Sequence, residues 1–200
     1  MSLHTFAPEE EHITELRRQL QRFVAQKMPR ALRRECDQNH TWPREIFKEL
    51  ADMGLIGLTV EEKHGGSGQD LVASVAVIEE LAQVGPFLAG PYIHAAFYGG
   101  MNLSENGSEA QKEALLPKIV NGELLLSYGL SEPNVGGDLA SVETRAEKKA
   151  GKIIVNGTKR WCTGADWSDY IYCLVRSGEA DARYKNLSKL LIPTDTPGIS

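Results

Sequence analysis

Cysteine is scarce in this sequence of 200 residues, which contains three: Cys36, Cys162 and Cys173. An odd number of cysteines without C-x-x-C spacing argues against a disulfide framework and against a zinc site. The sequence therefore predicts a protein of a reducing compartment that binds no metal.

Long apolar runs and an excess of positive charge are also missing. No stretch approaches the roughly 18–20 consecutive apolar residues of a membrane span, and the first residues are acidic where signal and transit peptides are basic. The formal net charge of −5 provides no positive field for the phosphate backbone of a nucleic acid. We therefore expect a cytoplasmic protein that has no membrane span and binds no nucleic acid.

The composition is that of an ordinary globular protein, with 42% hydrophobic and 24% charged residues. Up to about residue 124 the apolar residues recur at steps of three and four, the period of helices that bury one face. Small residues such as Gly99 and Gly100 would let another helix or a ligand approach closely. Pro117 is expected to disturb its helix, because proline removes a hydrogen bond and clashes with the preceding turn. Helices are predicted over residues 8–28, 41–54, 70–85, 91–103 and 108–122.

From residue 125 the pattern changes to short alternating or β-branched runs separated by turns, which are typical of strands. A hairpin is predicted over Lys152–Trp161, since Asn156-Gly157 can supply the two positive φ angles of a type I′ turn. The predicted fold is therefore α+β: an all-α helical domain over residues 1–124, followed by an antiparallel β-barrel-like domain over residues 125–200. Further strands are predicted at Val142–Lys148, Tyr170–Val175 and Lys189–Ile192.

The segment Tyr128–Asp138, with the sequence YGLSEPNVGGD, carries the first candidate binding feature. Pro133 forces the chain out of a strand, and Gly136 and Gly137 form a bare backbone without Cβ atoms that would obstruct a ligand. Such a loop can direct consecutive N–H groups at a phosphate or a polarised carbonyl. An ordinary turn after a strand is the alternative, because the spacing is neither that of a Walker loop nor G-x-G-x-x-G.

A second candidate feature is the segment Lys159–Ala165, with the sequence KRWCTGA. On a strand, Trp161 and Thr163 would point to the same side and offer a flat apolar surface together with a hydroxyl. This pairing suits a planar heteroaromatic ligand. The alternative is that Trp161 belongs to the hydrophobic core.

Together and in this order, the two segments resemble the signatures of the acyl-CoA dehydrogenase family. Tyr128–Asp138 is similar to the family's aromatic-x-Leu-Thr-Glu-Pro-x-Ala-Gly-Ser-Asp loop. Asn156–Ala165 is similar to its Asn-Gly-x-Lys-x-Trp-Ile-Thr-Asn-Gly segment. The loop Glu61–Gly68 and the run Asp195–Ile199 also resemble stretches of the family, so the likeness covers nearly the whole chain.

The resemblance implies a non-covalently bound FAD in a subunit of three domains, of which this sequence holds the N-terminal helical domain and most of the β-domain. It implies that the hydroxyl of Ser131 contacts the pyrimidine side of the flavin, that Trp161 flanks the ring, and that Thr163 bonds near N5. Gly137 stands where the family usually has a serine that also contacts CoA, which makes Gly137 a candidate for substrate binding. The candidate FAD-binding residues are Tyr128, Leu130, Ser131, Gly136, Gly137, Trp161, Cys162 and Thr163.

The implied reaction is the α,β-dehydrogenation of an acyl-CoA thioester, with electrons passing through FAD to an electron-transferring flavoprotein. A carboxylate would remove the α-proton while the β-hydrogen leaves as hydride. No carboxylate in residues 1–200 matches this catalytic base, which is expected beyond Ser200. Glu132 and Asp138 are expected to bond backbone N–H groups of their own turn. We therefore expect the sequence to be part of a longer enzyme, which the resemblance implies is a homo-oligomer, a tetramer or a dimer.

Two other functions remain open on these residues. An acyl-CoA oxidase or a flavin monooxygenase-like relative would use the same scaffold to let reduced flavin meet oxygen. A non-catalytic FAD-binding subunit of a hetero-oligomeric dehydrogenase would keep the fold and the flavin without the base.

Overall fold

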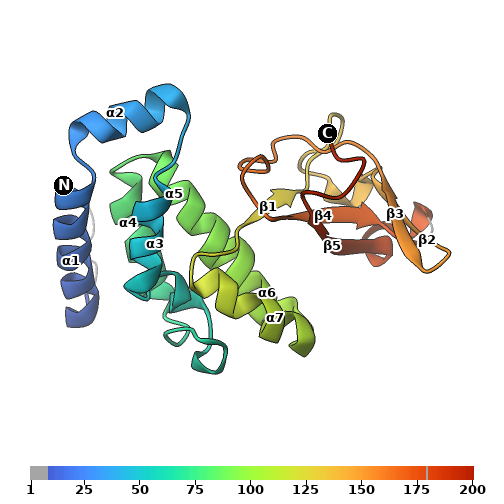
Figure 1. Ribbon diagram of the computed structural model, residues 1–200. Coiled ribbons are helices and arrows are strands. Elements are labelled where there is room, and N and C mark those ends of the chain that lie inside the picture. Colours follow the sequence, from blue (N-terminus) through green and yellow to red (C-terminus); the bar gives the residue numbers. More distant parts are fainter. Residues whose placement is uncertain (1–8, 179) are drawn as a thin grey trace, which may run out of the picture. The chain divides into compact units, whose positions relative to one another are not determined.

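The computed structural model describes residues 9–178 and 180–200, and its contacts divide the chain into two units. The first unit ends at Leu124 and is helical, and the second begins at Leu125 and contains the sheet (Figure 1). Each unit buries its own set of apolar side chains. The two units are therefore described separately.

The helical unit is built from α-helices, short 3-10 turns and one stretch of π-helix. Within the described ranges, no helix is long and apolar enough to cross a membrane. In chain order, the elements are α1 (Glu11–Lys27), α2 (Arg30–Asn39), α3 (Arg44–Asp52), η1 (Ile56–Thr59), η2 (Glu62–His64), α4 (Leu71–Ala82), α5 (Pro86–Tyr92), the π-helix η3 (Ile93–Met101), α6 (Asn102–Asn106) and α7 (Glu109–Val120).

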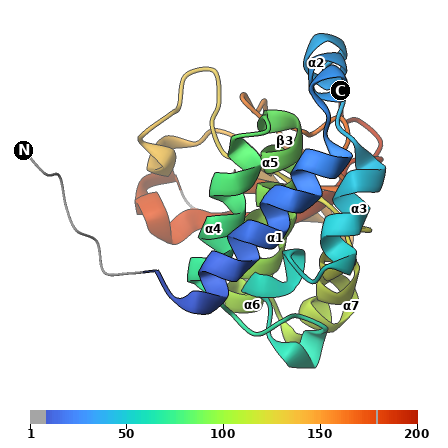
Figure 2. The same ribbon diagram turned by 90° about the vertical axis from the view of Figure 1, so that its left-hand side faces the viewer.

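Hydrophobic periodicity locates most of these helices correctly. The stripe of α1 is buried, and Ile13 packs against Ala73 and Ala76 of α4, which lies along α1 (Figure 2). The start of the first predicted helix at Pro8 lies outside the described residues. The sequence does not predict α2, because this charged helix buries only Cys36 and so has no apolar stripe.

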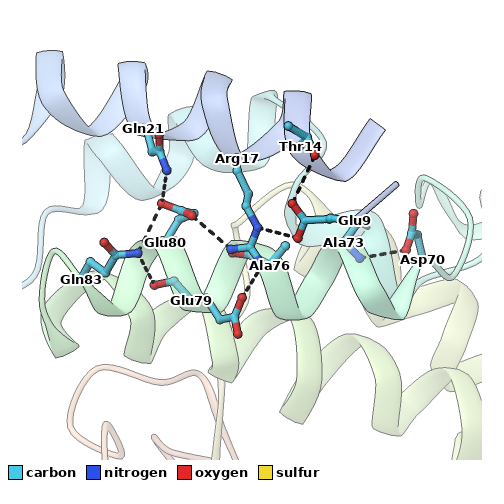
Figure 3. A network of polar contacts seen from close by, with 10 residues as sticks. All are labelled: Glu9, Thr14, Arg17, Gln21, Asp70, Ala73, Ala76, Glu79, Glu80 and Gln83. Carbon is cyan, nitrogen blue, oxygen red and sulfur yellow. Dashed lines mark hydrogen bonds and ion pairs between the residues drawn. The ribbon is translucent and has the colours of Figure 1, made fainter. Parts of the chain in front are cut away.

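A network of polar contacts joins α1 to α4 (Figure 3). The guanidinium of Arg17 reaches from α1 to Glu79 and Glu80 of α4, and it also bonds Glu9 at 2.9 Å. The hydrogen bond to Glu79 raises the pKa of Arg17 and outweighs the opposing effect of burial, so this side chain keeps its charge. Gln21 donates a further hydrogen bond of 3.0 Å to Glu80. The helix pair is therefore held by charge as well as by its apolar stripe.

The expectation that Pro117 disturbs its helix is wrong. Helix α7 continues through it to Val120, and the Pro117 carbonyl accepts a hydrogen bond of 3.0 Å from the N–H of Asn121. The residues Leu116, Ile119 and Val120 around the proline are buried. Burial of this last turn offsets the hydrogen bond that proline cannot donate.

The small residues of η3 allow close packing, as the sequence predicts. A Cβ on Gly100 would lie 2.7 Å from Oγ1 of Thr59 and 3.0 Å from Cγ2 of Val60. The hydroxyl of Thr59 donates a hydrogen bond of 2.6 Å to the carbonyl of Ala96. The backbone of the π-helix therefore packs directly against the side chains of Thr59 and Val60. A larger residue at position 100 would prevent this contact.

The sheet unit has one mixed sheet with β4 at its centre. Strand β1 runs parallel to the first half of β4, and β5 runs antiparallel along its whole length. The hairpin of β2 and β3 joins the end of β4 through a parallel bridge between Arg145 and Arg176. In chain order, the elements are β1 (Leu126–Gly129), η4 (Leu139–Ser141), β2 (Arg145–Lys149), β3 (Lys152–Asn156), β4 (Tyr170–Arg176), η5 (Ala180–Asn186) and β5 (Leu187–Pro193).

This topology confirms a helical region followed by a sheet but corrects the prediction that all strands are antiparallel. After β1 the chain leaves the sheet, forms the β2–β3 hairpin and returns before it enters β4. Because of this crossover, β4 starts beside the start of β1 and runs in the same direction.

The predicted hairpin turn at Asn156-Gly157 is also wrong. The turn lies at Ala150-Gly151, where φ is +49° and +76°, between the paired residues Lys149 and Lys152. Two positive φ angles are what a two-residue type I′ hairpin needs. Gly157 instead follows the end of β3, where a Cβ would lie 2.3 Å from Oγ1 of Thr144. This glycine is required by a close approach and not by a turn.

Candidate functional site

The first segment, Tyr128–Asp138, leaves the sheet at the end of β1. Glu132 and Val135 exchange backbone hydrogen bonds of 2.8 and 3.2 Å. These bonds close a tight turn at Pro133, where the sequence predicts that the chain leaves the strand. Leu130 packs against a buried cluster that contains Val135, Val142 and Leu174. The first segment is therefore anchored at its base and carries its turn on the surface.

Gly136 and Gly137 follow the turn and are exposed. No heavy atom beyond the neighbouring residues lies within 4 Å of a Cβ placed on either glycine. The space beside this backbone is open, so neither residue is a glycine for reasons of packing within the described unit. An open backbone of this kind is accessible to a phosphate or a carbonyl.

The second segment, Lys159–Ala165, lies beside β1 and the first segment. The hydroxyl of Ser127 on β1 donates a hydrogen bond of 2.9 Å to the carbonyl of Thr163. Four residues further along, the carbonyl of Ser131 accepts one of 2.8 Å from the N–H of Arg160. The two segments therefore run side by side in opposite directions.

A buried ion pair fastens the two segments together. The ammonium group of Lys159 lies 2.8 Å from Oε1 of Glu132 and 3.0 Å from the carbonyl oxygen of Leu130. The side chains of Lys159 and Glu132 are only 10% and 5% exposed. The sequence alone assigns no role to Lys159, although this residue belongs to the second segment and stands two positions before Trp161.

Glu132 accepts three more hydrogen bonds from the chain that leads into β2. Its carboxylate takes the N–H of Glu143 at 2.6 Å, and the N–H and hydroxyl of Thr144 at 2.9 and 2.5 Å. Glu132 therefore bonds backbone N–H groups as predicted, but they belong to the chain before β2 and not to its own turn. For Asp138 the same expectation is wrong, since the partners that the structure gives its carboxylate are the side chains of Ser141 and Arg183.

The charge state of Glu132 follows from these contacts. Burial would raise the pKa of its carboxyl, but Lys159, the Thr144 hydroxyl and the two N–H groups outweigh burial and lower the pKa to about 2. Glu132 is therefore ionised throughout the neutral range. A carboxylate held in this way is a poor proton acceptor and acts as a structural anchor.

Trp161 is 75% exposed, so the alternative that it belongs to the core of the sheet unit is wrong. The expectation that it shares a strand face with Thr163 is also wrong, because the second segment is not a strand and Trp161 has φ of +63°. The guanidinium of Arg160 lies 4.5 Å from the centre of the indole ring. Trp161 thus presents a large aromatic surface outside the sheet.

The remaining predicted residues lie around the same meeting point. The Sγ of Cys162, which is half-buried, lies 3.8 Å from the position of a Cβ on Gly129, and burial raises the pKa of the Cys162 thiol. Thr163 is exposed. The ring of Tyr128 lies 5.6 Å from that of Tyr172 in β4. The structure therefore brings Tyr128, Leu130, Ser131, Trp161, Cys162 and Thr163 to β1 and the two segments joined beside it.

Metal chemistry finds no support in the described part of the chain. No group of three or more His, Cys, Asp or Glu side chains lies there in an arrangement that could hold a metal ion. What the two joined segments offer instead is an exposed indole for stacking, an exposed threonine side chain and an open glycine backbone.

Comparison with known proteins identifies the family. The family model of the acyl-CoA dehydrogenase N-terminal domain matches residues 9–123, and that of the middle domain matches residues 127–200. The chain belongs to the acyl-CoA dehydrogenase family. The resemblance of the two segments to the family's signatures is thereby confirmed.

Individual members of the family are moderately similar to this chain. The probable acyl-CoA dehydrogenase YngJ of Bacillus subtilis (strain 168) is 32% identical over 82% of this chain and 43% of its own length. The mitochondrial isovaleryl-CoA dehydrogenase of Pongo abelii is 31% identical over 98% of this chain and 49% of its own length. The crystal structure of an acyl-CoA dehydrogenase from Geobacillus kaustophilus matches with a TM-score of 0.86 at 30% identity, over 97% of this chain and 51% of that one. The chain thus spans about half the length of these acyl-CoA dehydrogenases.

Proposed function

We propose that this chain is the N-terminal and middle part of a flavin-dependent enzyme that oxidises the Cα–Cβ bond of an acyl-CoA thioester to the 2-enoyl-CoA. The observation that carries the proposal is the union of the two segments, in which Lys159 and Arg160 bond the carbonyls of Leu130 and Ser131. Family membership supports the reaction class. The acyl group and the activity of the whole protein are part of the proposal.

The residues at the two joined segments fit FAD on two grounds. The open backbone at Gly136 and Gly137 leaves room for a phosphate beside N–H groups. The indole of Trp161, three-quarters exposed, is free to flank a flat ring. The remaining contacts to FAD would come from Tyr128, Leu130, Ser131, Cys162 and Thr163.

When bound, FAD supplies the acceptor for the hydride and the outlet for two electrons. The chain itself binds and orients. Since the carbonyls of Leu130 and Ser131 are already bonded to Lys159 and Arg160, and the N–H of Glu132 to Val135, this part of the backbone would offer the N–H of Ser131 to a ligand. The hydroxyls of Ser131 and Thr163 add donors that can turn toward an acceptor.

We assign no catalytic base within residues 1–200. Glu132 is held as an anion by Lys159, and Asp138 is bonded to Ser141 and Arg183. A general base needs a carboxylate that can accept a proton within reach of the substrate. We therefore propose that the base lies beyond Ser200.

Partners and location are also part of the proposal. The family resemblance favours an electron-transferring flavoprotein as acceptor, a homo-oligomer and a role in fatty acid β-oxidation. The scarcity of cysteine favours a reducing compartment such as the cytoplasm. The isovaleryl-CoA dehydrogenase of Pongo abelii, by contrast, is named as mitochondrial.

An absorbance spectrum of the protein from its complete reading frame tests the function. We expect flavin bands that are bleached, without oxygen, by one member of a panel of acyl-CoA thioesters. Oxygen consumption on turnover would indicate the oxidase instead, and a flavin that no thioester bleaches would indicate the non-catalytic subunit. A colourless protein that cannot be reconstituted with FAD would contradict the proposal.

Substitution of Trp161 tests whether the flavin binds beside the two joined segments. We expect Trp161→Ala to weaken FAD binding about 10-fold or more while the free energy of unfolding of the apoprotein changes by less than about 0.5 kcal/mol. Tyr184→Ala is the matched control, because this exposed aromatic residue lies in η5 and outside both segments. Equal FAD affinity in both variants would contradict a flavin beside Trp161.

A further inference from the structure

Lys159 makes two contacts of different kinds at the point where the segments meet. The pairing with Glu132 satisfies the charge of a buried ammonium group, which would otherwise be costly. The second contact, of 3.0 Å, is to the backbone carbonyl of Leu130. The ion pair alone neutralises the charge of Lys159. The second contact therefore has another effect, which is to orient the Leu130 carbonyl.

The contact with the Leu130 carbonyl fixes a peptide plane. The bond between Leu130 and Ser131 is trans, so its C=O and N–H groups point to opposite sides of the chain. Because the carbonyl points to Lys159, the N–H of Ser131 points away from it. The contact of Lys159 with the Leu130 carbonyl therefore fixes the direction in which the N–H of Ser131 points.

The next peptide, between Ser131 and Glu132, also has its carbonyl and its N–H bonded on opposite sides of the chain. The carbonyl of Ser131 faces the second segment and accepts from Arg160 at 2.8 Å. The N–H of Glu132, on the same peptide, points to the other side and donates to Val135 at 2.8 Å. Two successive peptides are thus oriented by the second segment.

We propose that Lys159 is a positioning residue for the flavin, which sets the Leu130–Ser131 peptide so that the N–H of Ser131 is directed at the ligand. The inference rests on the proposed function, because Ser131 is one of the proposed flavin contacts. Glu132 keeps the ammonium group in place, and the bonds of Glu132 to Glu143 and Thr144 tie this arrangement to the entrance of β2. Lys159 acts on the ligand through Ser131 and does not touch it.

The test separates the two contacts of Lys159. Glu132→Gln removes the negative charge but keeps an amide oxygen that can accept a hydrogen bond from Lys159, so the ammonium group can stay beside the Leu130 carbonyl. The double variant Lys159→Met with Glu132→Gln differs from it only at position 159, and neither variant leaves a buried carboxylate without its cation. The protein is expressed from its complete reading frame, and the FAD dissociation constant is measured by titrating the apoprotein.

We expect the double variant to bind FAD about 10-fold or more weakly than Glu132→Gln, because a hydrogen bond from a charged group no longer orients the peptide. The flavin absorption maximum of the double variant should also shift. Lys159→Arg in the same background keeps donors near the carbonyl and should recover most of the lost affinity. Lys152→Met in that background is the control, since this exposed lysine lies on β3 and its loss should leave FAD binding unchanged.

Urea unfolding of the apoprotein distinguishes positioning from a purely structural role. If the double variant loses stability but binds FAD as tightly as Glu132→Gln, the inference is overturned. If the double variant does not fold, Lys159→Gln with Glu132→Gln takes its place, and equal FAD affinity would again overturn the inference. If the unaltered protein binds no FAD, the proposed function fails first and the inference fails with it.

Discussion

A carboxylate that is 5% exposed keeps its charge only where several donors face it, and Glu132 has four. Lys159 supplies the charge, and Glu143 and Thr144 supply two N–H groups and a hydroxyl. Breaking such a set from one side leaves the opposite charge buried and unpaired. The pair therefore joins three stretches of chain: the first segment, the second segment and the start of β2.

The pH dependence of stability should reveal this carboxylate. The pKa of Glu132 is about 2 in the folded protein, against an ordinary value of 4.5, so its contribution is complete above about pH 5 and is lost as the pH falls toward 2. Between pH 5 and pH 3, we expect the free energy of unfolding to fall by about 2 kcal/mol more in the unaltered protein than in Glu132→Gln. Urea unfolding at the two pH values measures this difference.

Asp138→Asn serves as the control for this prediction. Asp138 lies in the same segment, but its side chain is 56% exposed and paired with an exposed arginine. Its contribution to stability should be small, as for most surface ion pairs. Parallel pH curves for the unaltered protein and Glu132→Gln would show that the carboxylate is not held as described.

At the scale of elements, one arginine links α1 to two carboxylates of α4. Arg17 is 24% exposed and faces Glu80, which is 7% exposed and would lose its cation if Arg17 were replaced. We expect Arg17→Met to lower the free energy of unfolding by about 2–4 kcal/mol. Chemical unfolding followed by helical circular dichroism measures the loss.

The neighbouring Arg18 provides a matched control. Its side chain is 57% exposed and pairs with Glu15, one turn away on the same helix. Arg18→Met should therefore change stability by less than about 0.5 kcal/mol. Similar losses in the two variants would mean that the contact between α1 and α4 does not depend on Arg17.

Two glycines in neighbouring helical elements should respond to alanine in opposite directions. A Cβ on Gly100 would clash with Thr59 and Val60, whereas no atom lies within 4 Å of a Cβ on Gly90. We expect Gly100→Ala to destabilise the protein by about 1–3 kcal/mol and Gly90→Ala to stabilise it by about 0.5–1 kcal/mol. Thermal unfolding of the two variants compares them, and a neutral Gly100→Ala would contradict the close packing of η3 on η1.

At the scale of the whole molecule, the chain divides at Leu124 into two units that each bury an apolar core. We propose from this division that residues 1–124 form a domain that folds by itself, and we expect the fragment 1–124 to give a helical spectrum and a cooperative thermal transition. A fragment 1–107, which lacks the buried residues of α7, should not fold cooperatively. A gradual transition in the fragment 1–124 would contradict the independence of the helical unit.

The sequence by itself determined the features that depend on neighbouring residues. Period and capping located most helices, including α7 with its Ser108 capping box, and β-branched runs located β4 and β5. The two signature-like segments were sufficient to indicate the family. The sequence could also indicate that Glu132 is a structural carboxylate, although the N–H groups that it bonds lie 11 and 12 residues away.

Only the tertiary structure decided the features that depend on the path of the chain. The pairing of Lys159 with Glu132 joins residues 27 positions apart, and no local pattern specifies it. The parallel direction of β1 and β4 follows from the crossover between them, and the hairpin turn at Ala150-Gly151 follows from the register of β2 and β3. Trp161 could not be placed from sequence, because the same apolar side chain suits a core and an exposed stacking surface equally, and the fold alone decides which of them it meets.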